Sequence, residues 1–208
     1  MPSKYKNYQE FENAKIKCKT CYIGKYYNKV VLSDGYKKDP IILIIGEAPG
    51  KTEVELETPF IGASGKLLRK TLNDFGFNKG NSLITNIIPC RPLDNKFPTD
   101  KDVVAKCMQL WLKEEIILTN PKCLLLVGAK PLSYILSFKT NNDRYIINNG
   151  EWFGLNVNGN KIKCLATYHP AFILRKGYDK NILESFRNHI KKVADVFIGK
   201  KEDKSCNK

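Results

Sequence analysis

Seven cysteines give this chain of 208 residues its first candidates for metal chemistry. Cys18 and Cys21 form a C-x-x-C pair, a spacing that lets two thiolates reach one metal centre. The later pair, Cys90 and Cys107, completes a candidate set of four ligands. The odd number of cysteines and the lack of an apolar secretory segment argue against a disulfide framework. From residue types alone, zinc and an iron–sulfur cluster are equally good interpretations.

The other three cysteines are expected to have no ligand role. Cys123 and Cys164 lie in apolar runs, where a thiol packs as a small hydrophobic side chain. Cys206 lies in the charged segment 201–208, which is predicted to be a flexible tail after a single domain of residues 1–200. A hydrophobic content of 42% is typical of a soluble globular domain.

The segment GEAPGKT, residues 46–52, ends like a phosphate-binding loop. It is one residue too short between its two glycines for that motif. Pro49 also removes a backbone amide from a loop that would bind phosphate through its amides. The helix that should run on from Lys51 is interrupted in sequence by Pro59 and Gly62. We therefore predict no nucleotide cofactor.

Elements that would position these residues follow from the apolar pattern. Continuous apolar runs predict buried parallel strands, covered on both faces, at 41–45, 82–88, 123–128 and 163–168. Helical patterns are expected at 64–76, 99–120, 130–138 and 178–199. Strands alternating with helices predict an α/β sandwich, whose sites form at the carboxyl ends of the strands.

Local signals sharpen the ends of these elements. Ser64 and Thr99 are the expected N-caps of their helices, and Gly76 is the expected stop of the first. Asn158-Gly159 within 151–164 predicts a hairpin turn.

The charge balance favours a polyanionic partner. Lys and Arg outnumber Asp and Glu by 35 to 21, which gives a net charge of +14. A sequence rich in Lys, Asn and Ile from an AT-biased genome would show the same excess, so charge alone leaves the partner open. No apolar run reaches the length of a membrane span, and a cytoplasmic location without membrane association is expected.

Several motifs together resemble family-4 uracil-DNA glycosylases, the iron–sulfur branch of bacteria and archaea. They occur in the family's order over residues 10 to 195: CKTC at 18–21, GEAPGKTEVELETPFIGASGKLL at 46–68, LITNIIPCRP at 83–92, LLLVGAKP at 124–131 and YHPAFILR at 168–175. The resemblance implies a three-layer α/β/α sandwich with a central four-stranded parallel sheet. It also implies a [4Fe–4S] cluster on the four cysteines, and hydrolysis of the N-glycosidic bond of deoxyuridine in single- or double-stranded DNA. A monomer is expected, associated with the nucleoid, with a sliding clamp or a polymerase as candidate protein partner.

Three residues match the family's uracil pocket. Asn86 would read the base, because its amide can accept from N3–H and donate to O4. Phe60 would stack on the flipped base, and His169 would donate to O2, where negative charge develops. Without the motifs, these would be a strand-end Asn, a core Phe and a capping or core His. The second histidine, His189, is expected at the surface.

The acidic residues of the first motif are less specific. The backbone amides near Glu47 and Ala48 are expected to bind oxygen atoms. Glu53 matches a carboxylate that lines the family's pocket, where it would either position water or exclude the 5-methyl group of thymine. Both interpretations of Glu53 remain open from the sequence.

A DNA surface is expected around these motifs. Leu174 would act as an apolar wedge beside Arg175, and Arg91 would add charge. Ser64 and Gly65 would begin a helix whose amides hold a phosphate. An alternative is a DNA-binding module of the same fold without catalysis. A branch that crosslinks to the abasic site is disfavoured, because CRPLDNKFPTDKD has neither a His nor a basic cluster.

Overall fold

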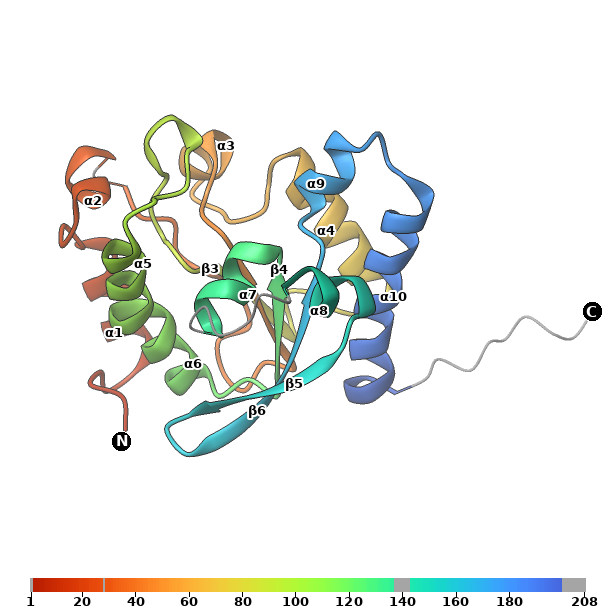
Figure 1. Cartoon of the computed structure of the whole chain (residues 1–208). Helices are drawn as coiled ribbons and strands as arrows, with labels where there is room; N and C mark the ends of the chain where they lie inside the picture. The colour runs from red at the N-terminus through yellow and green to blue at the C-terminus, as the bar shows by residue number, and fades with distance from the viewer. Residues whose placement is uncertain (1, 28, 137–142, 200–208) are drawn as a thin grey trace, which may run out of the picture.

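The computed structural model of the chain describes residues 2–27, 29–136 and 143–199. Within these residues, six strands form one sheet in the order β1-β3-β2-β4-β6-β5. Figure 1 shows the sheet between helices of the two sides. The strands are β1 (Asp34–Gly35), β2 (Ile42–Gly46), β3 (Ser82–Asn86), β4 (Cys123–Val127), β5 (Trp152–Val157) and β6 (Asn160–Thr167). The predicted tail 201–208 lies outside the described residues.

Four parallel strands make up the centre of the sheet, as predicted. β3, β2, β4 and β6 pair in parallel, and every residue of β2, β3 and β4 is buried. Two antiparallel edge strands, β1 and β5, extend this core. β1 has only two residues, Asp34 and Gly35, so no apolar run marks it in the sequence.

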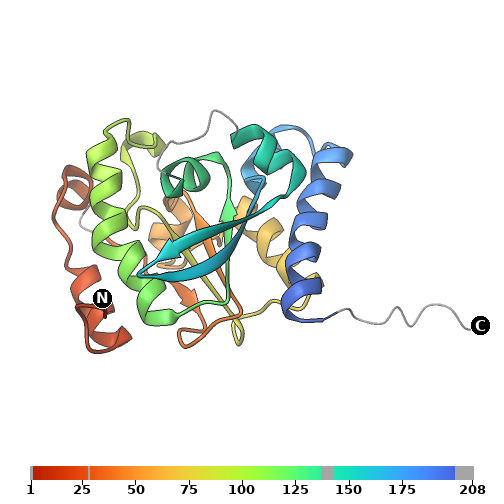
Figure 2. The same ribbon diagram turned by 60° about the horizontal axis from the view of Figure 1, so that its bottom comes forward.

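Helices cover both faces of the sheet. One layer packs on the odd-numbered side chains of β2, and the other packs on the even-numbered ones. The first layer contains α2 (Tyr22–Tyr27), α5 (Lys101–Cys107), α6 (Lys113–Thr119), α7 (Ala129–Ile135) and α8 (Asp143–Asn149). The second contains α4 (Ala63–Asp74), α9 (Pro170–Arg175) and α10 (Lys180–Phe197), and Figure 2 shows α10 and α5–α6 on opposite sides of the sheet. The predicted three-layer sandwich is therefore confirmed.

Most of the turns and helices predicted from the sequence are present in the structure. The β5–β6 hairpin turns at Asn158 and Gly159, whose φ angles of 54° and 85° are those of a two-residue turn. Gly76, with φ of 87°, follows α4 as expected. The expected helix 99–120 is built from α5, a π-helical turn η2 (Met108–Leu112) and α6. In the part of the chain that the structure describes, no helix combines the length and apolar character needed to cross a bilayer.

Two predicted N-caps are wrong. α4 is capped at Gly62 rather than at Ser64, because the Glu53 carboxylate accepts the Gly62 amide and fixes the chain before the helix. α5 is capped by Asp100 rather than by Thr99. The Asp100 carboxylate accepts from two amides of the first turn, a charge-assisted contact that the neighbouring hydroxyl does not match.

A short helix does begin at Lys51, against expectation. α3 (Lys51–Glu55) is capped at Gly50, whose amide donates to the Glu53 carboxylate. The helix ends well before Pro59, so the interruption seen in the sequence limits its length instead of preventing it.

His189 is also misplaced by the sequence interpretation. It is only 6% exposed, and its Nδ1 lies 3.1 Å from the Thr167 hydroxyl. The reason is helical periodicity: position 189 falls on the face of α10 that buries Phe186, Ile190 and Val193 against the sheet.

Candidate active site

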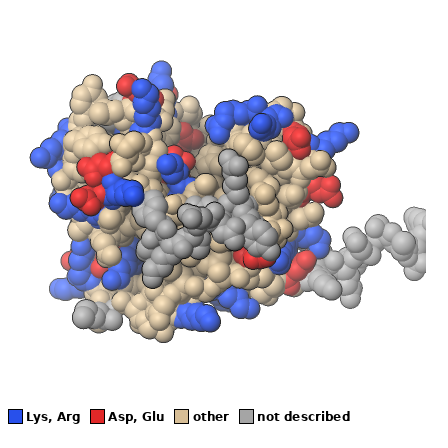
Figure 3. Space-filling model, in the orientation of Figure 1, with Lys and Arg blue, Asp and Glu red and all other residues tan. Residues whose placement is uncertain are grey.

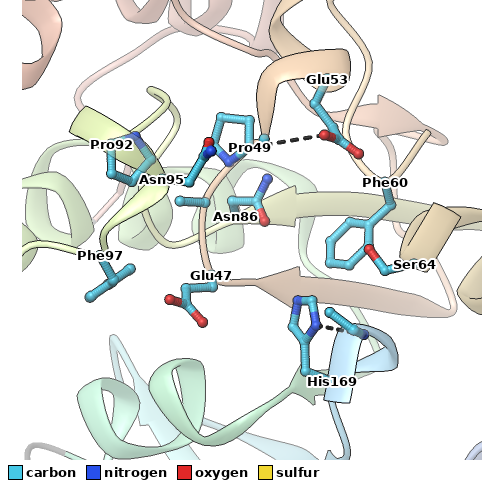
Figure 4. A pocket seen from close by; sticks show the side chains of 13 residues that line it. Glu47, Pro49, Glu53, Phe60, Ser64, Asn86, Pro92, Asn95, Phe97 and His169 are labelled. Atoms are coloured by element: carbon cyan, nitrogen blue, oxygen red, sulfur yellow. Dashed lines mark hydrogen bonds between the residues drawn. The ribbon is translucent and has the colours of Figure 1, made fainter. Parts of the chain in front are cut away.

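A cavity of about 280 Å³ opens at the carboxyl ends of β2 and β3. All six residues expected to bind substrate line it, together with Ser64 (Figure 4). They come from the loop after β2, the short helix α3, the loop before α4, the start of α4, the end of β3 and the start of α9. The complete lining is Glu47, Ala48, Pro49, Gly50, Glu53, Phe60, Ser64, Asn86, Pro92, Asn95, Phe97, His169 and Ala171.

Asn86 is the last residue of β3 and is only 8% exposed. Its Oδ1 is buried and has no hydrogen-bond partner among the described residues. A buried acceptor without a partner is uncommon in folded proteins and calls for an explanation. Gly46 pairs with Asn86 across the sheet, and a Cβ there would lie 2.5 Å from Oδ1 and 2.3 Å from the Phe60 ring. The glycine therefore leaves the room that both side chains occupy.

Phe60 forms a side wall of the cavity. Its backbone has φ of 53°, the left-handed region that a bulky residue adopts only when its surroundings impose it. Its ring centroid lies 6.0 Å from that of His169, with an angle of 32° between the planes. The two rings thus border the same space as the Asn86 amide (Figure 4).

His169 caps helix α9 and lines the cavity at the same time. Its Nδ1 accepts the Ala171 amide at 3.1 Å, so the proton of the neutral ring is on Nε2. Burial lowers the His169 pKa to about 4, helped by the positive charge of Arg175 and opposed by Glu53. At neutral pH the ring is therefore uncharged and has one N–H available for hydrogen bonding.

The Glu53 carboxylate is already engaged by the backbone. Oε1 accepts the amides of Gly62 at 2.9 Å and Ile61 at 3.2 Å, and Oε2 accepts the amide of Gly50 at 3.2 Å. Glu53 thereby joins the start of α3 to the start of α4. Three amides on one carboxylate hold the two loops that form the cavity wall.

Glu47 is the other acidic side chain in the lining. Burial raises its pKa, while the nearby charges of Lys130 and Arg175 lower it. The backbone around it is fixed, because the carbonyls of Gly46 and Glu47 accept the amides of Ile87 and Ile88. Ala48 follows Glu47 and is half-buried in the lining.

Sequence reasoning missed the segment after β3, which contributes Pro92, Asn95 and Phe97 to the lining. Asp94 and Asn95 both have left-handed backbone, with φ of 52° and 56°. Asp and Asn tolerate this region better than other non-glycine residues, so their succession was a usable turn signal.

The residues predicted to contact DNA differ in their exposure and contacts. Arg91 donates to the Asn95 side chain at 2.8 Å, and Arg175 is exposed at the end of α9 next to the half-buried Leu174. Figure 3 shows basic side chains over the region of α9. Gly65 is buried, and a Cβ there would lie 2.0 Å from the carbonyl carbon of Phe60, so a side chain at this position would collide with the Phe60 backbone.

The four cysteines predicted as ligands lie near one another. Burial, together with the nearby thiols of Cys18 and Cys21, raises the pKa of Cys90 to about 12. Burial also raises the pKa of Cys107, and the other three thiols and a side-chain hydrogen bond with Cys21 act in the same direction. Within the described residues, no three His, Cys, Asp or Glu side chains have the arrangement that holds a single metal ion.

The two cysteines predicted as core residues are fully buried in the sheet. Cys123 and Cys164 have no exposed surface, which confirms that prediction.

Comparison with known proteins identifies the family. Residues 33–193 match the model of the uracil DNA glycosylase superfamily. The chain is 31% identical over 185 residues to a type-4 uracil-DNA glycosylase of Pyrobaculum aerophilum, covering 88% of each chain. It is 32% identical over 187 residues to the type-4 enzyme of Saccharolobus solfataricus, covering 88% of this chain and 83% of that one. A type-4 enzyme of Thermotoga maritima is 32% identical over 160 residues, with 76% and 79% covered. These matches confirm the resemblance seen in the motifs, and the chain belongs to the uracil-DNA glycosylase superfamily.

Proposed function

We propose that this protein is a monofunctional uracil-DNA glycosylase. It flips deoxyuridine out of DNA and hydrolyses the N-glycosidic bond, which releases uracil, leaves an abasic site and begins base excision repair. Its relatives are named type-4 uracil-DNA glycosylases. The observation that carries the proposal is one cavity in which an unpartnered amide oxygen, a neutral imidazole and an aromatic ring face the same space.

Base recognition rests on Asn86. Its buried Oδ1 would accept from N3–H of uracil, and its Nδ2 would donate to O4. Cytosine reverses the polarity of both positions, so a single fixed amide discriminates between the two bases. Phe60 would stack on the flipped ring, an interaction worth roughly 1–3 kcal/mol.

Leaving-group stabilisation rests on His169. Negative charge accumulates on uracil as the bond to the sugar breaks, and the Nε2–H of a neutral ring would donate to O2 where that charge develops. This requires no proton transfer. Burial and the Ala171 contact already hold the ring in the neutral, correctly oriented form before DNA binds.

The two acidic residues divide their roles by their contacts. The oxygens of Glu53 are occupied by three backbone amides, which supports a role in shaping the wall, including the side that would face a thymine methyl. Among the described residues, no backbone amide donates to the Glu47 carboxylate, which lies near Lys130 and Arg175. We assign the positioning of the attacking water to Glu47 and to the amides of Glu47 and Ala48.

DNA binding would use the rim of the cavity. Leu174 would fill the vacated stack, while Arg175 and Arg91 would contact phosphates together with the amides near Ser64 and Gly65. Binding should therefore weaken steeply as the salt concentration rises.

A [4Fe–4S] cluster would be held by Cys18, Cys21, Cys90 and Cys107. The fit rests on the donor set, since four soft thiols lie within electrostatic reach of one another and two of them are buried. Hydrolysis needs no electron, so the cluster would anchor the N-terminal segment to the loop after β3. Anaerobically purified protein should show a broad visible absorbance band; a colourless protein containing zinc would contradict this.

The protein would act as a monomer in the cytoplasm, on nucleoid DNA, with a sliding clamp or a polymerase as partner. Sedimentation analysis and pull-down with purified clamp would test these points.

The activity is tested with a fluorescent single-stranded oligonucleotide that contains one uracil, followed by alkaline cleavage. Cleavage at the uracil position is expected. Retained DNA affinity without product would favour the non-catalytic module, and a heat-stable protein–DNA adduct would indicate the crosslinking branch. Oligonucleotides with hypoxanthine in place of uracil would define the base range.

A further inference from the structure

We propose that Arg69 and Asp34 form a clamp that positions Phe60, and that Arg69 is thereby a positioning residue for base stacking. The inference rests on the proposed function, because it concerns the ring assigned to the flipped base. Neither residue lines the cavity, and none of the motifs discussed above contains Asp34.

The clamp acts on both peptide groups that flank Phe60. Arg69 Nε donates to the Phe60 carbonyl at 2.9 Å, and Nη2 donates to the Pro59 carbonyl at 2.7 Å. One carbonyl precedes the Phe60 Cα and the other follows it, so these two contacts fix both backbone dihedrals of Phe60. The planar guanidinium of Arg has several N–H donors in a fixed arrangement and can bind two carbonyls at once. The ammonium group of Lys is a compact charge without that fixed arrangement of donors.

The residue that Arg69 contacts, Phe60, has a strained backbone. Phe60 has φ of 53°, which a bulky side chain does not adopt without external restraint. The same peptide is restrained from the other side, because the Ile61 amide donates to Glu53. Gly65 lets α4, which carries Arg69, approach the Phe60 backbone closely.

Asp34 connects the clamp to the sheet. Its Oδ2 accepts Arg69 Nη2 at 2.8 Å, and its Oδ1 accepts Lys79 at 2.8 Å. Asp34 belongs to β1, which pairs with β3 so that Asp34 lies opposite Ile84. β3 ends in Asn86, so the stacking wall and the base-reading amide share one rigid support.

The decisive experiment is a double-mutant cycle between Arg69→Gln and Phe60→Ala. Arg69→Gln should raise KM for the uracil oligonucleotide, and the inhibition constant of free uracil, by about tenfold. In the Phe60→Ala background the same substitution should change neither value, because the residue acts through the ring. An equal loss in both backgrounds would overturn the proposal.

Matched controls separate the clamp from general stability. Arg187→Gln removes another Arg–Asp pair of α4, the contact with Asp74 at 2.7 Å, and should leave KM unchanged. Arg69→Lys should restore part of the loss, and Asp34→Asn should show a smaller effect than Arg69→Gln. An Arg187→Gln defect equal to that of Arg69→Gln would refute a positioning role.

Hydrogen exchange keeps the inference separate from the proposed function. The amides of residues 60–62 should exchange faster in Arg69→Gln than in wild type, while those of α10 should not. If wild type lacks glycosylase activity but this change is seen, the proposed function fails and the clamp stands. Unchanged exchange at residues 60–62 would refute the clamp whatever the activity.

Discussion

Thr85 and Asn86 are neighbours in β3, but their side chains lie in two different polar environments. Thr85 points into a buried cluster in which the Glu115 carboxylate is bonded by Thr85, Lys15, Tyr8 and Ser33. Asn86 faces the cavity, where its Oδ1 has no partner in the described part of the chain. Successive strand residues alternate between the faces of a sheet, which separates the two environments by a single position.

The difference distinguishes a structural group from one prepared for a ligand. Burial raises the pKa of Glu115, but the Lys15 charge and the hydrogen bonds from Ser33 and Tyr8 outweigh it, so the carboxylate is ionised and fully paired. Such a cluster holds α1 (Tyr8–Ile16) and α6 against the sheet. A buried amide oxygen without a hydrogen-bond partner instead lowers the stability of the folded protein until a ligand supplies the missing hydrogen bond.

Breaking the paired cluster should give the largest effect, and it should be on stability. Glu115→Gln leaves Lys15 buried without its counter-ion and should lower the free energy of unfolding by about 3–5 kcal/mol. Chemical denaturation measures this. Asp195→Asn, which removes a partly exposed pair with Lys191, is the control and should lose under about 0.5 kcal/mol. Equal losses in both variants would refute the structural role of Glu115.

His169→Ala should give the largest effect on catalysis. Removing a donor to a developing oxyanion lowers the single-turnover rate by roughly 10²–10³-fold. Rapid quench on the uracil oligonucleotide measures it, with His189→Ala as the control on the other histidine. A rate within about twofold of wild type would eliminate the leaving-group role.

Asn86→Asp should sharpen the contrast with its neighbour. It replaces the donor aimed at O4 with an acceptor, so uracil excision should fall by about 1–3 kcal/mol in kcat/KM, with little loss of stability. Thr85→Val should do the reverse, losing about 1 kcal/mol of stability and no activity. Parallel assays and melts of the two variants test this, and matching profiles would contradict the assignment.

The smallest expected effect is that of pH. His169 has a folded pKa of about 4, below its ordinary value of 6.5, so the unfolded chain binds more protons between these values. Stability should therefore fall as pH drops through this interval, and His189 adds in the same sense. Activity should stay flat from about pH 8 to about pH 6, since the ring remains neutral. A transition in kcat/KM near pH 6.5 that disappears in His169→Ala would show that His169 has its ordinary pKa, and would contradict this prediction.

Much of the fold could be read directly from the chain. Continuous apolar runs marked all four parallel strands, Asn158-Gly159 marked the hairpin, and the spacing of the strands placed their loops at one edge. These features depend on neighbouring residues, whose periodicity and backbone preferences are local. The motifs also identified the six lining residues expected to bind substrate, because all six lie in motif segments at that edge.

Contacts between segments far apart in the sequence were decided by the tertiary structure alone. The Arg69–Asp34 pair spans 35 positions and the Lys15–Glu115 pair spans 100, and nothing in the local sequence links either pair. The Glu53 carboxylate that caps two helices, and the burial of His189, likewise depend on what packs against them. The sequence therefore determined which side chains are available for chemistry, and packing decided which are free to react and which are held.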